Sequence, residues 1–81
     1  MNSGRLERAA AAIADRTKYD SGGVQVIDLA ALYEEIEADS EPERARARRE
    51  VAGALIDAIP EAIARVTVAA DSITVTGWRA Q

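Results

Sequence analysis

The segment SEPERARARREVAGALIDAI, residues 40–59, decides how the rest of the chain is interpreted. Ser40 stands three residues before Glu43, which is the spacing of a capping box, where each side chain bonds the other residue's backbone N–H. Pro42 suits the first turn of a helix, where its missing N–H is not needed. The spacing therefore predicts a helix over residues 41–59, which Pro60 ends, or which continues for one further turn to Ile63.

The first half of this helix carries a cluster of arginines, namely Arg44, Arg46, Arg48 and Arg49. Seven acidic residues and no basic residue lie between Ser21 and Glu43, so the charge changes sign abruptly where the helix begins. Such a cluster predicts a surface that meets something negative. Nucleic acid is one candidate for that contact, and the chain's own acidic segment is the other.

The second half of the helix is apolar along one side. The residues predicted to be buried there are Val51, Ala52, Leu55, Ile56 and Ile59. On a helical wheel Arg44 and Arg48 extend the stripe of Val51 and Leu55, whereas Arg46 and Arg49 point away from it. We therefore expect the first half of the helix to project beyond the core.

Two further helices are predicted before this segment. Apolar residues at helical spacing predict a first helix over residues 4–18, with Ser3 placed to cap it, and the pair Gly22-Gly23 breaks the pattern. Residues 24–27 follow as a short strand. A second helix over residues 29–39 has Asp28 at its start, an acidic outer face, and an apolar stripe made of Leu29, Leu32, Tyr33 and Ile36.

The end of the chain changes to a period of two. Residues 66–69 and 72–76 alternate around Ala70-Asp71, which predicts an antiparallel hairpin. The whole chain, residues 1–81, is expected to form a single α+β domain with a small core.

Composition excludes several classes of function. The chain has no His and no Cys, and its Ser and Thr hydroxyls have no obvious base at a defined spacing, so we expect no catalytic site and no enzyme. The acidic run lacks the Gly-bearing loop of a hard-cation site, so we expect neither a metal nor another cofactor. No segment resembles a targeting signal or a membrane span, which leads us to expect a cytoplasmic protein.

The element order helix, short strand, helix, helix, hairpin resembles that of winged helix-turn-helix domains. The resemblance covers nearly the whole chain and is one of topology and length. It implies that residues 29–39 form the supporting helix, residues 41–59 the recognition helix, and residues 65–78 the wing. It also implies that the first strand pairs with the wing.

Two functions follow from this resemblance. In the first, the protein is a transcriptional or mobile-element regulator that contacts double-stranded DNA through Arg44, Arg46, Arg48, Arg49 and Arg65. In the second, it is a protein-interaction module, an inhibitor or adaptor, that uses the acidic second helix and an apolar patch near Trp78. The net charge of -4 and the Asp71 in the wing oppose the first.

The surface distinguishes the two functions. A basic face continuous across the third helix, Arg5 or Arg16, and Arg65 favours DNA, whereas arginines paired to glutamates favour protein binding. The small core, with few aromatic residues to fill it, leads us to expect a homodimer under either reading.

Overall fold

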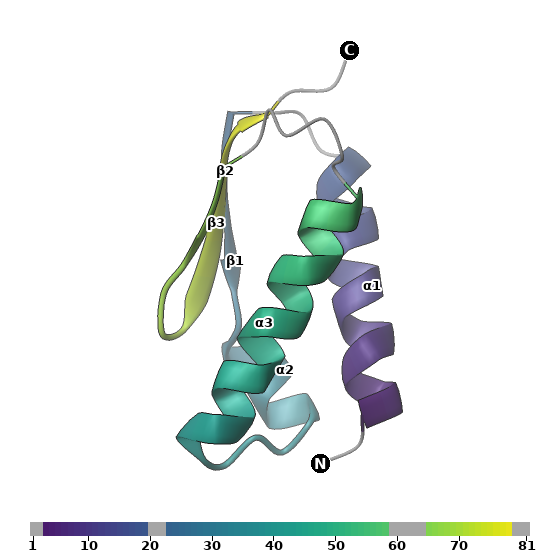
Figure 1. The fold of residues 1–81 in the computed structure, drawn as a ribbon, viewed down its shortest axis with the longest axis vertical. Coiled ribbons are helices and arrows are strands. Elements are labelled where there is room, and N and C mark those ends of the chain that lie inside the picture. Colours follow the sequence, from purple (N-terminus) through teal and green to yellow (C-terminus); the bar gives the residue numbers. More distant parts are fainter. Residues whose placement is uncertain (1–2, 20–22, 59–64, 79–81) are drawn as a thin grey trace.

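The computed structural model describes residues 3–19, 23–58 and 65–78, which form three helices and a three-stranded sheet (Figure 1). The elements in chain order are α1 (Ser3–Tyr19), β1 (Gly23–Asp28), α2 (Ala30–Glu35), α3 (Glu41–Ala58), β2 (Arg65–Val68) and β3 (Ser72–Trp78). The predicted α+β class and the predicted order of elements are confirmed. Helix α1 begins at Ser3, so this residue lies inside the helix and not at its cap.

The sheet is antiparallel with the strand order β1-β3-β2. The predicted hairpin is confirmed, and its turn is closed by the Ala69 N–H, which donates to the Ser72 carbonyl at 2.8 Å. Strand β1 pairs with β3, with Ile27 opposite Ile73. This pairing is compatible with a winged-helix-like arrangement, in which the first strand joins the hairpin.

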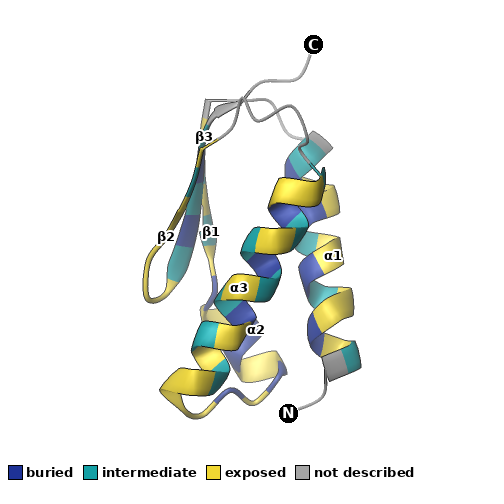
Figure 2. Ribbon diagram, in the orientation of Figure 1, coloured by how far each residue is buried: buried dark blue, intermediate teal, exposed yellow. Residues whose placement is uncertain are grey.

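The core lies between one face of the sheet and the helices (Figure 2). Helix α3 contacts both α1 and β2, and all three helices lie on the same side of the sheet (Figure 1). The buried apolar residues are Leu6, Ala10, Ala14, Leu29, Leu32, Tyr33, Ile36, Ala38, Ala47, Val51, Leu55, Ile73 and Val75. The predicted stripes of α1 and α2 are therefore confirmed, because their main apolar residues belong to this set.

Two predictions about α3 were wrong. Ile56 is 59% exposed because it follows Leu55 by 100° around the helix and lies outside the face that the sheet and α1 cover. The first half of α3 does not project beyond the core, since Ala47 is fully buried. The predicted burial of Ile59 and the end of the helix at Pro60 lie outside the described residues.

Helix α2 is shorter than the predicted span of residues 29–39, because the chain reverses at Glu37. Glu37 has a φ of 58°, and its N–H donates to the Glu34 carbonyl at 3.2 Å. The Ala38 N–H reaches the Tyr33 carbonyl at 2.9 Å. These two bonds form a Schellman closure, with Glu37 at the position that Gly usually fills.

The predicted capping box of α3 is confirmed, whereas α2 has Leu29 at its N-cap with no side-chain cap bond, and Asp28 acts from the position before it. Asp28 Oδ1 accepts a hydrogen bond from the Ala30 N–H at 3.0 Å. The Glu43 carboxylate accepts from the Ser40 N–H at 3.2 Å, and the Glu43 N–H donates back to Ser40 Oγ at 3.4 Å. Each bond satisfies a backbone amide that the helix itself leaves without a partner. In the described part of the chain, no helix has the length and apolar character needed to cross a bilayer.

Candidate functional site

Arg44 is held against the end of α2. Its Nε donates a hydrogen bond to the Ala38 carbonyl at 2.9 Å. Its guanidinium carbon lies 5.3 Å from the centroid of the Tyr33 ring, which is within the range of a cation–π interaction. Arg44 therefore stabilises the packing of α3 on α2.

Arg48 joins three elements, and its side chain is only 14% exposed. Its Nη1 donates to Ala70 O in the hairpin turn at 3.0 Å and to the Tyr33 hydroxyl at 3.2 Å. Its Nη2 pairs with the Glu41 carboxylate. The bond to Glu41 and the bond to Tyr33 raise the pKa of Arg48 above its usual value, so the guanidinium is charged at any physiological pH.

Tyr33 completes this network, and sequence reasoning missed its role. Its hydroxyl donates to Ala70 O at 2.7 Å and also accepts the bond from Arg48. The one available signal was a Tyr in the apolar stripe of α2, because a buried Tyr usually finds a partner for its hydroxyl. Since Ala70 is 37 residues away along the chain, spacing could not identify that partner.

The remaining arginines of the predicted site lie on different surfaces. Arg46 and Arg49 are exposed on the outward side of α3. Arg65 is opposite Thr76, on the same face of the sheet as Thr74 and opposite to the buried Ile73 and Val75. The structure therefore separates Arg65 from the arginines of α3 by the thickness of the sheet. Arg5 donates to the Glu35 carbonyl at 2.9 Å, away from Arg65.

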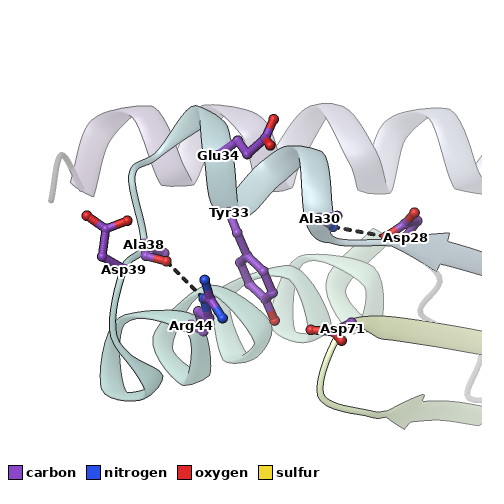
Figure 3. Close-up of a pocket in the computed structure, with 8 residues that line it drawn as sticks. All are labelled: Asp28, Ala30, Tyr33, Glu34, Ala38, Asp39, Arg44 and Asp71. Atoms are coloured by element: carbon purple, nitrogen blue, oxygen red, sulfur yellow. Dashed lines mark hydrogen bonds between the residues drawn. The ribbon is translucent and has the colours of Figure 1, made fainter.

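Four acidic residues surround one cavity beside Tyr33. An open cavity of about 450 Å³ is lined by Asp28, Ala30, Tyr33, Glu34, Ala38, Asp39, Arg44 and Asp71 (Figure 3). Its four carboxylates come from the end of β1, from α2, from the connection to α3, and from the hairpin turn. We call this surface the acidic cavity.

The acidic cavity holds more negative than positive charge. Arg44 is the one basic side chain among its lining residues, against four carboxylates, and that Arg stacks on Tyr33. Asp28 uses one oxygen to accept from Ala30, while the carboxylates of Glu34, Asp39 and Asp71 bond to no other described residue. Within residues 3–19, 23–58 and 65–78, no group of acidic side chains is placed to hold a metal ion.

Trp78, the predicted interface residue, ends β3 opposite Gly23, and its side chain lies outside what is described. A comparison of the chain with protein-family models, curated proteins and solved structures finds no match. The resemblance to winged helices therefore depends on element order and sheet topology alone.

Proposed function

We propose that this protein is a winged-helix-like interaction module whose acidic cavity binds a basic segment of a partner protein. The observation that carries the proposal is that Asp28, Glu34, Asp39 and Asp71, from four separate parts of the chain, line one open cavity. The carboxylates of Glu34, Asp39 and Asp71, which bond to no other described residue, can attract a lysine or arginine side chain and steer its approach. The net charge of -4 adds to this attraction.

The positions of the arginines support this reading over DNA binding. Arg44 and Arg48 contact Tyr33, and Arg48 also pairs with Glu41, so both serve the packing of α3. Asp71 lies in the hairpin turn, where a wing would approach phosphates, and a carboxylate there repels them. The same carboxylate attracts a basic segment of a protein.

DNA binding through Arg46 and Arg49 is the second candidate. Both are exposed on the outward side of α3, the helix that enters the major groove in winged helix-turn-helix domains. About two phosphate contacts per chain give a slope of affinity against salt, on logarithmic axes, of about -1.8. That slope is half of the value expected if all four arginines of α3 reached phosphates.

The test compares the binding of a fluorescent lysine- and arginine-rich peptide with that of a fluorescent DNA duplex. The double change Glu34→Gln and Asp39→Asn removes two negative charges from the acidic cavity. We expect this variant to bind the peptide at least tenfold more weakly than the natural chain. Glu7→Gln with Asp57→Asn is the matched control, because these two exposed residues do not line the cavity. Equal weakening in both variants would show a general effect of net charge and contradict the proposal.

The DNA arm uses the double change Arg46→Ala and Arg49→Ala. Under the proposed function neither the natural chain nor this variant binds the duplex at physiological salt, and both bind the peptide. Strong duplex binding that the double change removes would favour the second candidate instead.

A further inference from the structure

Among the described strands, none pairs with the outer hydrogen-bonding edge of β1, which we call the free edge. Strand β1 lies at one end of the strand order β1-β3-β2, and α1 packs mainly against α3. The Leu29 N–H donates to Asp71 O at 2.9 Å, one step beyond the pair Asp28–Ser72. Because the backbone groups of an antiparallel strand alternate in direction, those of Gln25 and Ile27 face β3, and those of Val24 and Val26 face the free edge.

This edge is unusually apolar. Val24 and Val26 are 70% and 65% exposed, the highest values among the large apolar residues of the described chain. Their side chains are opposite Thr76 and Thr74, on the face of the sheet that no described helix covers. Natural edge strands are usually protected by charge, by Pro or by short length. The only charged residue of β1 is Asp28, at the very end of the strand.

The other edge of the sheet is better protected. Strand β2 has four residues and begins with Arg65, whereas β1 has six. The register irregularity of β1 lies between Gly23 and Val24, before the two exposed valines, so it does not interrupt them. The unprotected edge is therefore the segment Val24-Gln25-Val26.

We propose that β1 pairs antiparallel with β1 of a second copy of this chain, about a two-fold axis at Gln25. The segment Val-Gln-Val has the same sequence in both directions. The axis therefore sets Val24 of each copy opposite Val26 of the other copy, which gives two equivalent pairs. Both residues face the free edge, so each such pair exchanges two N–H···O bonds. The valines of both copies then form one apolar patch on the same face of a continuous sheet.

The sequence of the edge favours a second copy as its occupant. Val24-Gln25-Val26 is its own antiparallel complement, so two copies present identical apolar edges to each other. An isologous contact of this kind closes after two chains, so it stops at a dimer. None of Val24, Gln25 and Val26 lines the acidic cavity, so this pairing does not depend on the proposed function.

Sedimentation equilibrium over a wide range of concentrations tests the dimer. We expect twice the monomer mass for the natural chain and for Ile56→Lys, the control, which removes a similarly exposed apolar residue from α3. Val26→Lys places a charge in the centre of the edge and should give the monomer mass, with an unchanged circular dichroism spectrum. A natural chain that stays monomeric, or a Val26→Lys variant that stays dimeric, overturns the proposal.

A cysteine scan tests the register, because the natural chain has no Cys. Pairing about Gln25 sets the two Cα atoms of residue 25 about 4.5 Å apart, within the range of a disulfide. We expect Gln25→Cys to form a covalent dimer on mild oxidation at least tenfold faster than Thr67→Cys, an exposed residue of β2. Equal rates, or no cross-link at residue 25, overturn the pairing about Gln25.

Discussion

At the scale of single residues, Tyr33 determines what the arginines of α3 can do. Its ring lies under Arg44 and its hydroxyl accepts from Arg48, so both guanidinium groups point towards α2 and the hairpin turn. Arg46 and Arg49, one helical face away, remain exposed. Two arginines of α3 therefore hold the fold together, and the other two lie on the surface.

Tyr33→Phe should lower the free energy of unfolding by about 1 kcal/mol, because it removes the hydroxyl and its bond to Ala70 O. Urea unfolding measures this change as a shift of the midpoint at constant slope. Glu34→Gln, an exposed neighbour on the same helix, is the control and should stay within about 0.5 kcal/mol of the natural chain. An unchanged midpoint for Tyr33→Phe would contradict the network.

Arg48→Ala should lower the melting temperature, whereas Arg49→Ala should leave it nearly unchanged. Arg48 bonds to Glu41, Tyr33 and Ala70, and its loss leaves those groups without their charged partner. Thermal unfolding followed by circular dichroism compares the two variants at the same net charge. Equal melting temperatures would show that Arg48 is no more structural than its exposed neighbour.

At the scale of the elements, local bonds set where α2 ends and α3 begins. The Schellman closure ends α2 at a residue with a positive φ, and the capping box starts α3 four residues later. The turn between them brings Asp39 to the rim of the acidic cavity. The end of α2 leads to a prediction about stability, and the start of α3 leads to a prediction about the pH dependence of stability.

Glu37→Gly should stabilise the protein by about 0.5 to 1 kcal/mol, because Gly adopts a φ of 58° without the steric cost that a side chain carries there. Glu35→Gly, two residues earlier and inside α2, is the matched control and should destabilise it by a similar amount. Chemical unfolding measures both. Destabilisation by both changes would mean that Glu37 makes a contact that outweighs its backbone strain.

The capping box makes stability depend on pH. The bond from the Asp39 N–H, joined by those from Ser40, holds the pKa of Glu43 below its usual value of 4.5. A carboxylate with a lowered pKa in the folded state contributes stability above pH 4.5, which is lost as the pH falls through the lowered value. As the pH falls below 4.5, the melting temperature of the natural chain should therefore drop further than that of Glu43→Gln. Parallel pH profiles for the two proteins would rule out this contribution.

At the scale of the whole molecule, stability depends on one small core shared by the sheet and α3. A chain of this length has a free energy of unfolding of about 4 to 12 kcal/mol. Leu55 is fully buried in this core, whereas its neighbour Ile56 is 59% exposed. We therefore expect these two adjacent residues of α3 to differ widely in their contribution to the free energy of unfolding.

Leu55→Ala should cost about 2 to 5 kcal/mol, which is a large part of the total and leaves some molecules unfolded at 37 °C. Ile56→Ala should cost less than about 1 kcal/mol, because its side chain is already in contact with water. Urea unfolding of the two variants gives the difference directly. Similar costs would mean that Ile56 is covered in solution, as a dimer through α3 would require.

The elements and most of their boundaries could be predicted from the sequence, because these depend on residues no more than four positions apart. The capping box of Ser40 and Glu43, the stripe of α2 and the two-residue period of the hairpin all act at that range. The sequence could not show which arginines Tyr33 holds, that Ala47 is buried and Ile56 is not, or that Asp28, Glu34, Asp39 and Asp71 line one cavity. Those outcomes depend on how the hairpin and α2 dock against α3, and docking joins residues that are far apart in the chain.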